Sequence, residues 1–200
     1  MSSSLALHTF YRDLDADLVE KLQKIKLVVF DVDGTLTDGS IILDDTSREF
    51  KCFDCKDGMG ISLLQKAGLK VALLTGRYSF LTTRRAQELQ IKYVIQGERD
   101  KEDALLRLMH ELNVSDEELA TMGDDINDMP LFKHAAVSAA PADAYYYMRS
   151  IASIVLHANG GRGAVREFAD LILMAQGHVT PEGDAIFMRK NNIKFALTGQ

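Results

Sequence analysis

The chain has 200 residues, 46% of them hydrophobic and 26% charged, which is enough for one domain with a substantial core and does not demand a second. Its net charge of −6 argues against nucleic-acid binding, which usually requires a basic surface. No apolar run approaches the length of a membrane span, and the N-terminal residues lack the basic flank and long apolar core of a secretion signal. We therefore expect a cytoplasmic protein that binds neither nucleic acid nor membranes.

The N-terminal part of the chain contains four predicted elements. Apolar residues at helical spacing predict an amphipathic helix over residues 12–24. The apolar run over residues 27–30, Leu-Val-Val-Phe, is typical of a short strand that is buried on both faces. Alternating residues on both sides of a polar turn predict a β-hairpin over about residues 40–53. A helix then begins near Asp57 and ends at Gly68.

Strands and helices then alternate to about residue 175. Strands are predicted at 70–74, 93–95, 119–122, 135–138 and 154–155, and helices at 80–89, 101–112, 129–133, 142–148 and from about 164 to 175. This repetition predicts an α/β fold: a Rossmann-like, doubly wound, mostly parallel sheet from which the hairpin projects. We expect a single domain over residues 1–177. The C-terminal tail, residues 178–200, shows little periodicity, and its structure is left open.

Two carboxylates, Asp31 and Asp33, follow the first buried strand. Sites in open α/β sheets form at such strand ends. Two acids this close together are costly unless a cation or a proton offsets their charge, and hard oxygen ligands suit Mg²⁺. A structural turn at the Asp-Gly pair is the simpler alternative. A calcium loop of the EF-hand kind is excluded, because its sixth position requires glycine and is Leu36 or Asp38 here.

Other strand ends carry polar groups of matching chemistry. Thr75 ends a second predicted strand, and Asp124 with Asp125 follows a later one. The carboxyl ends of parallel strands lie at one edge of a sheet, so these groups should converge with the acidic pair. Lys101 stands at a helix start, where a cation is unfavourable unless it reaches an anion bound there. Each residue alone has a structural explanation, but together they indicate a site for a phosphoryl group and a metal.

Four segments in this order, DVDGTLTDG, TGR, Lys101 and GDDINDMP, resemble the motifs of the haloacid dehalogenase-like phosphatases. The resemblance implies that Asp31 is a nucleophile that forms an aspartyl-phosphate and that Asp33 is the general acid/base. It also implies phosphate binding by Thr75, Gly76 and Lys101. The Mg²⁺ ligands that it implies are Asp31, Asp33 (through its backbone carbonyl) and Asp124, with Asp125 and Asp128 behind them.

The spacing between these motifs leaves no room for a cap domain. Within the superfamily, the capless arrangement resembles the family of 3-deoxy-D-manno-octulosonate 8-phosphate (KDO 8-phosphate) phosphatases. The matching segments are DGMGI at 57–61, LLTGRYS at 73–79, GDDINDMP at 123–130 and GGRGAVREFADLIL at 160–173. The resemblance implies hydrolysis of KDO 8-phosphate to KDO and phosphate in lipopolysaccharide precursor biosynthesis. Two alternatives remain: a phosphatase of a nine-carbon 2-keto sugar-acid 9-phosphate and, disfavoured by Asp33, a non-enzymatic receiver-type phosphoacceptor.

A crevice without a cap needs some other cover, because the hydrolysis of a small substrate requires that bulk water be excluded. The predicted hairpin carries apolar residues that it is too small to bury by itself. We therefore expect a homotetramer whose sites form at subunit boundaries, where a neighbouring subunit covers each crevice. Lys56 and Arg77 are candidates to bind the carboxylate of a phosphorylated sugar acid, and Arg166 is a further candidate for substrate binding.

Overall fold

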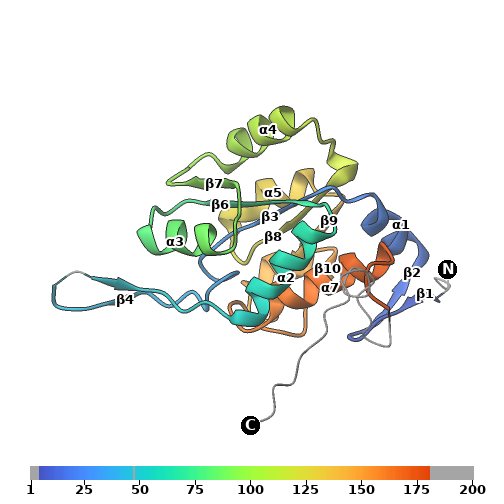
Figure 1. The fold of residues 1–200 in the computed structure, drawn as a ribbon, viewed down its shortest axis with the longest axis horizontal. Coiled ribbons are helices and arrows are strands. Elements are labelled where there is room, and N and C mark those ends of the chain that lie inside the picture. Colours follow the sequence, from blue (N-terminus) through green and yellow to red (C-terminus); the bar gives the residue numbers. More distant parts are fainter. Residues whose placement is uncertain (1–4, 47, 181–200) are drawn as a thin grey trace, which may run out of the picture.

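The computed structural model describes residues 5–46 and 48–180. At its centre is a six-stranded parallel sheet in the order β10-β9-β8-β3-β6-β7, with helices on both faces (Figure 1). The strands are β3 (Leu27–Phe30), β6 (Lys70–Thr75), β7 (Tyr93–Gln96), β8 (Leu119–Met122), β9 (Val137–Ala140) and β10 (Ile154–Val155). The helices are α1 (Ala16–Lys24), α2 (Cys55–Lys66), α3 (Phe80–Glu88), α4 (Lys101–Leu112), α5 (Met129–His134), α6 (Tyr146–Ile151) and α7 (Ala164–Ala175).

The central strand β3 is apolar throughout because it is covered on both faces. Val28 and Phe30 belong to a core formed with α1, α2, α3 and α7, whereas Leu27 and Val29 belong to a second core formed with α4, α5 and α6. β3 pairs with β6 on one side and with β8 on the other. The residues that follow β3 therefore emerge in the middle of the carboxyl edge of the sheet, between the ends of two neighbours. This confirms the predicted doubly wound α/β fold.

The predicted hairpin projects from the carboxyl edge of the sheet (Figure 1). Its strands β4 (Ile42–Leu43) and β5 (Glu49–Phe50) pair antiparallel, with Ile42 opposite Phe50 and Leu43 opposite Glu49. Between the end of β3 and the start of β6, the only regular elements in the described part of the chain are this hairpin and α2. The absence of a cap domain there agrees with the prediction.

Four predicted elements have boundaries that are wrong by two or more residues. The helix predicted to begin near Asp57 begins at Cys55, because the Asp54 side chain caps it by accepting from the Lys56 amide (2.6 Å). The first helix begins at Ala16 instead of residue 12, because the preceding residues pair as the strands β1 (Leu5–His8) and β2 (Asp13–Asp15), and the Asp15 side chain caps α1. The strand predicted at 135–138 lies at 137–140. The helix predicted at 142–148 begins only at Tyr146, because a turn from Pro141 to Ala144 precedes it and Asp143 accepts a hydrogen bond from the distant Gly160 amide (2.9 Å).

The end of α7 is closed by a turn in which Gly177 has a positive φ of 72° and the His178 amide donates to the Leu173 carbonyl (2.8 Å). Most of the predicted tail, residues 181–200, lies outside the described residues, and the division at residue 177 stays a prediction. None of the helices in the described ranges is long and apolar enough to cross a membrane.

Candidate active site

The loop after β3 is a tight turn in which the Val32 carbonyl accepts hydrogen bonds from the amides of the following turn, among them that of Leu36 (2.9 Å). Gly34 in this turn has a φ of +92°, a conformation that favours glycine. A Cβ at Gly34 would also overlap the carboxylate of Asp124, which arrives from the loop after β8. Glycine is thus required at this position both by the backbone and by the close approach of an acid.

Three carboxylates meet at this point. Asp31, Asp124 and Asp128 each offer an oxygen, and these oxygens lie within 4.8 Å of one another. We call these three residues the acidic cluster. Lys101, at the start of α4, donates hydrogen bonds to Asp31 Oδ1 (2.6 Å) and to Asp128 Oδ1 (2.5 Å). The side chains of Lys101, Asp31 and Asp128 are all at most 5% exposed, so the ion pairs are shielded from water.

The charges of the acidic cluster are not balanced by the protein alone. When all three carboxylates are ionised they face one ammonium group, which leaves two negative charges. Burial, and then the Asp128 carboxylate, raise the pKa of Asp31 well above its ordinary value, and Lys101 only partly offsets this. Burial, and then Asp128 and Asp125, raise the pKa of Asp124 to about 7. Burial lowers the pKa of Lys101, but the Asp31 and Asp128 carboxylates outweigh it and raise the pKa, so this lysine stays charged.

Asp128 has a larger part in the site than the sequence predicts. It lies at the end of the 3-10 turn η2 (Ile126–Asp128) and is fully buried. Its Oδ2 accepts from the amides of Asp124 (3.0 Å) and Asp125 (3.4 Å), while its Oδ1 pairs with Lys101. A Cβ at Gly123 would overlap it. Asp125 instead is exposed and caps η2 by accepting from the Ile126 amide (2.7 Å). Asp128 is therefore part of the acidic cluster, and Asp125 stands outside it.

The side chain of Asp33 is not part of the acidic cluster. Its Oδ1 forms an ion pair with Lys51, which follows β5 of the hairpin and whose side chain is 2% exposed. Glu49, two residues earlier, accepts hydrogen bonds from Ser79 Oγ (2.7 Å) and Arg77 (3.0 Å). Sequence reasoning missed Lys51, because a single lysine at the end of a hairpin arm carries no pattern that sets it apart from a solvated surface charge.

The remaining predicted residues differ in how closely they approach this centre. Thr75 ends β6 beside β3, is buried, and its Oγ1 accepts from the Arg77 amide (3.3 Å); Gly76 lies between them. Lys56 is exposed and 3.5 Å from Asp54. Arg166 pairs through Nε with Asp170, one turn along α7 (2.8 Å).

A glycine-rich loop, residues 159–163, packs directly on the turn after β3. The Gly161 amide donates to the Thr35 carbonyl (2.9 Å), and a Cβ at Gly160 would overlap the Gly34 carbonyl oxygen. The buried Asp57 of α2 anchors the other end of this loop by accepting from the amides of Gly163 (3.2 Å) and Arg166 (2.8 Å). The GGRG segment therefore supports the acidic turn through backbone contacts that only glycine permits.

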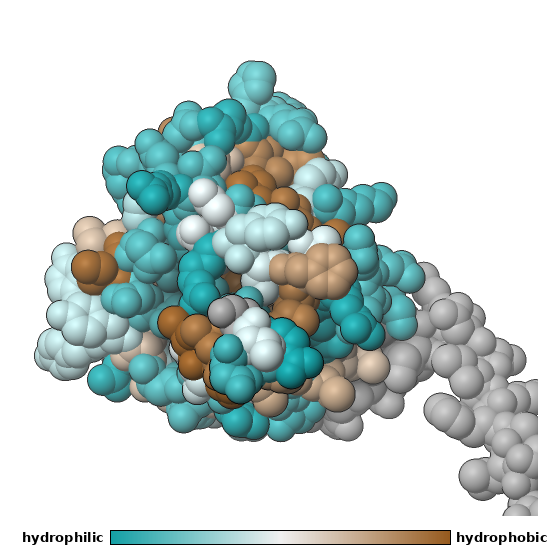
Figure 2. All heavy atoms as spheres, turned by 90° about the vertical axis from the view of Figure 1, so that its left-hand side faces the viewer, coloured by the Kyte–Doolittle hydropathy of each residue, from teal (hydrophilic) through white to brown (hydrophobic). Residues whose placement is uncertain are grey.

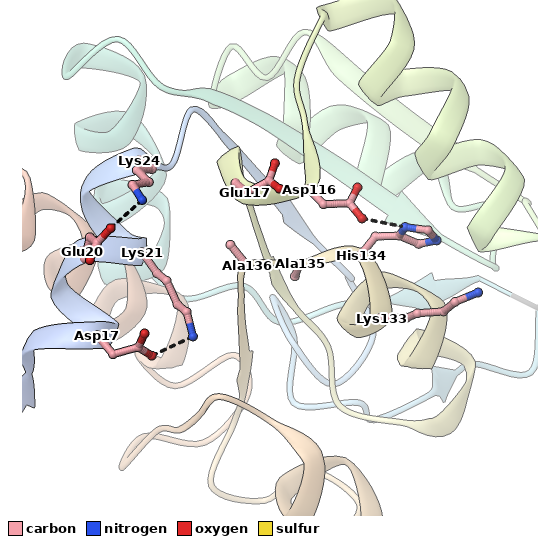
Figure 3. Close-up of a pocket in the computed structure, with 10 residues that line it drawn as sticks. All are labelled: Asp17, Glu20, Lys21, Lys24, Asp116, Glu117, Lys133, His134, Ala135 and Ala136. Atoms are coloured by element: carbon pink, nitrogen blue, oxygen red, sulfur yellow. Dashed lines mark hydrogen bonds and ion pairs between the residues drawn. The ribbon is translucent and has the colours of Figure 1, made fainter. Parts of the chain in front are cut away.

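A separate cavity of about 310 Å³ opens at the amino ends of the strands, opposite the acidic cluster (Figure 3). It is lined by Asp17, Glu20, Lys21, Lys24, Asp116, Glu117, Lys133, His134, Ala135 and Ala136. Its charged groups largely pair with each other, as in Asp17 with Lys21 and Glu20 with Lys24. This cavity therefore lacks the excess of carboxylates over cations that marks the acidic cluster. We place the candidate active site at the carboxyl edge of the sheet.

Comparison with known proteins identifies the family to which the chain belongs. Residues 94–168 match the family described as haloacid dehalogenase-like hydrolase. The chain is 43% identical over 158 residues to the 3-deoxy-D-manno-octulosonate 8-phosphate phosphatase KdsC of Haemophilus influenzae, which covers 79% of this chain and 88% of that protein.

Two solved structures of such phosphatases share the fold at 37% identity. The structure from Yersinia pestis has a TM-score of 0.85 and covers 91% of this chain and 98% of that chain. The structure from Moraxella catarrhalis is a complex with a magnesium ion, a phosphate ion and KDO. It has a TM-score of 0.79, and the match covers 81% of this chain and 93% of that chain. The chain is a haloacid dehalogenase-like hydrolase. Within that superfamily it belongs to the family of KDO 8-phosphate phosphatases, which confirms the resemblance drawn from the motifs.

Proposed function

We propose that this protein is a Mg²⁺-dependent phosphatase that hydrolyses KDO 8-phosphate to KDO and phosphate in lipopolysaccharide precursor biosynthesis. The observation that carries the proposal is the acidic cluster bridged by the buried Lys101 at the carboxyl edge of the sheet. The family relationship adds the substrate, because the Moraxella catarrhalis relative was solved with magnesium, phosphate and KDO together.

The residues of the acidic cluster fit Mg²⁺. Asp31 and Asp124 would hold it, with the Asp33 backbone carbonyl as a further ligand and Asp128 directly behind. Carboxylate oxygens are the donors that this ion prefers, and the two uncompensated negative charges match its charge. When bound, Mg²⁺ supplies positive charge that offsets the charge of the phosphoryl oxygens.

The chain's own residues would then divide the reaction into two steps. An Asp31 oxygen attacks phosphorus, the bond from phosphorus to the sugar oxygen breaks, and that oxygen takes a proton from Asp33. The Asp33 carboxylate next removes a proton from water, whose oxygen attacks the aspartyl-phosphate. Phosphate leaves, the Asp31 carboxylate is regenerated, and Asp33 is protonated again.

Cations and donors around the crevice would bind the substrate. Thr75, the Gly76 amide and Lys101 would stabilise the phosphoryl oxygens; their place at the same sheet edge as Asp31 supports this role. Of the rim cations, Arg77 follows Thr75 and Gly76 directly in the chain and is a candidate to meet the sugar-acid carboxylate, although it would first have to leave Glu49. Lys56 remains a second candidate, and Arg166 would first have to leave Asp170.

Phosphate release tests the proposal. Purified protein with Mg²⁺ is assayed on KDO 8-phosphate and on a nine-carbon 2-keto sugar-acid 9-phosphate, with and without EDTA. We expect faster release from KDO 8-phosphate, loss of release in EDTA, and loss of turnover in Asp31→Asn with an unchanged circular dichroism spectrum. Asp103→Asn on the exposed face of α4 is the matched control. Near-normal release by Asp31→Asn would refute the covalent mechanism, and preference for the nine-carbon compound would refute the assigned substrate.

We further propose that the working unit is a homotetramer in which the hairpin of one subunit helps to cover the site of another. Figure 2 shows apolar side chains on the face that carries the hairpin. Ile41, Ile42, Leu43 and Phe50 are each more than half exposed. Such a cluster on a small projection is typical of an association surface.

Assembly is tested by analytical ultracentrifugation of Phe50→Glu at the assay concentration. We expect dissociation together with loss of activity, whereas Phe10→Glu, an exposed aromatic outside the hairpin, should do neither. A Phe50→Glu monomer with full activity would rule out a shared site.

A further inference from the structure

The hairpin presents two different faces to its surroundings. Along its second arm the side chains alternate, so that Glu49 and Lys51 share one face and Phe50 lies on the other. Phe50 is 51% exposed, whereas the side chain of Lys51 is 2% exposed and that of Glu49 is 22% exposed. The charged face thus turns toward the residues that follow β3 and β6, which is the reverse of the usual arrangement in a surface hairpin.

The inward face connects two of the strand ends that form the site. Lys51 pairs with Asp33 after β3, and Glu49 accepts from Ser79 and Arg77 after β6. The two hairpin residues also approach each other, with Lys51 Nζ 3.7 Å from a Glu49 oxygen. Burying an ammonium group is costly unless its partners are well placed. Burial of Lys51 does not complete a core of the hairpin, since most of the other large side chains of the hairpin are exposed.

We infer that Lys51 is a positioning residue that holds the Asp33 carboxylate outside the acidic cluster, in position to protonate the leaving oxygen. This inference rests on the proposed function. In an in-line displacement, the attacking Asp31 oxygen and the leaving oxygen lie on opposite sides of phosphorus. Asp33 is two residues from Asp31 and next to a group of carboxylates with uncompensated charge. The Lys51 ammonium group, on the hairpin side, attracts the Asp33 carboxylate in competition with any cation bound at the acidic cluster. It thereby keeps Asp33 beside the leaving oxygen.

Lys51 itself transfers no proton in this arrangement. Its three N–H bonds are donors only, so it can donate to one Asp33 oxygen while the other oxygen gives up or takes the proton. The bond from phosphorus to the leaving oxygen breaks, and the proton on that oxygen comes from Asp33. Removing Lys51 should therefore lower kcat/KM most for substrates whose leaving oxygen is strongly basic and must be protonated as the bond to phosphorus breaks.

The test is a series of aryl phosphates with graded leaving-group acidity, from phenyl phosphate to p-nitrophenyl phosphate, assayed for kcat/KM. This constant covers steps only up to phosphoenzyme formation, and none of these substrates carries a sugar acid that Lys51 could bind directly. The variants are Lys51→Met and Lys51→Arg. Arg48→Met is the control, because Arg48 lies in the same hairpin with an exposed side chain that pairs, among the described residues, with Asp44. Circular dichroism and sedimentation check that folding and assembly are unchanged.

We expect Lys51→Met to lose about tenfold or more in kcat/KM on phenyl phosphate and much less on p-nitrophenyl phosphate, which leaves without a proton. Lys51→Arg should recover part of the loss, and Arg48→Met should follow the wild type across the series. A uniform loss at all leaving groups, or no loss, would overturn the inference. If Asp31→Asn still released phosphate, the proposed function would fail instead, so the two failures are distinguishable.

Discussion

The buried Lys101 offers a direct test of the electrostatics of the site through the substitution Lys101→Met. Methionine keeps most of the apolar stem and removes the ammonium group that bridges Asp31 and Asp128. Both acids and the lysine are at most 5% exposed, so water cannot replace the lost partner. Removing one member of a buried ion pair costs about 3–5 kcal/mol of unfolding free energy, and we expect a loss in this range near about pH 8.

The loss should depend on pH in a defined direction. Burial and the Asp128 carboxylate already hold the pKa of Asp31 above its unfolded value, and loss of Lys101 removes the main opposing charge. A carboxyl group whose pKa is higher in the folded chain costs stability once the pH rises above the unfolded value. The deficit of Lys101→Met relative to the wild type should therefore shrink by more than half between about pH 8 and about pH 5.

The assay is urea unfolding of both proteins at equal concentration, in EDTA and in Mg²⁺, at these two pH values. Mg²⁺ should recover part of the loss, because it offers the same carboxylates another cation. Lys133→Met is the control, since its pair with Glu102 is exposed to solvent and should contribute little to stability. A loss below about 1 kcal/mol for Lys101→Met near pH 8, or a loss that does not change with pH, would refute the reasoning.

Two further predictions concern the turn and the metal. Gly160→Ala should reduce activity strongly and destabilise the fold by about 1–3 kcal/mol, because the added Cβ would overlap the Gly34 carbonyl. Gly68→Ala, whose added Cβ meets no atom within 4 Å, should keep its activity. Equal activity in the two variants would contradict this prediction. The increase in Tm caused by Mg²⁺ should grow as the pH rises from about 6 to about 8, because burial raises the pKa of Asp124 to about 7 and this residue must lose its proton to bind the metal. Thermal unfolding of the wild type and of Asp124→Asn, each with and without Mg²⁺, checks this prediction. An equal pH dependence in both proteins would argue against Asp124 as a ligand.

The order of the elements and the centre of the site could be predicted from the sequence. The apolar run of β3 and the alternation after it set a parallel sheet, and parallel strands bring their carboxyl ends to one edge. The convergence of Asp31, Lys101 and Asp124 follows from that geometry alone. The lack of a cap domain also followed from residue spacing, since too few residues separate the motifs to form one.

Other features were decided only by the tertiary structure. Lys51 reaches Asp33 because the second arm of the hairpin returns to the carboxyl edge of the sheet beside the loop after β3, a path that no periodic pattern in the sequence describes. Asp128 joins the acidic cluster because η2 turns its side chain back under the loop after β8. Periodicity reports which face of an element is buried, and it is set by neighbours along the chain. Contacts between loops depend instead on the direction in which each loop leaves its strand, which is settled only when distant segments pack together.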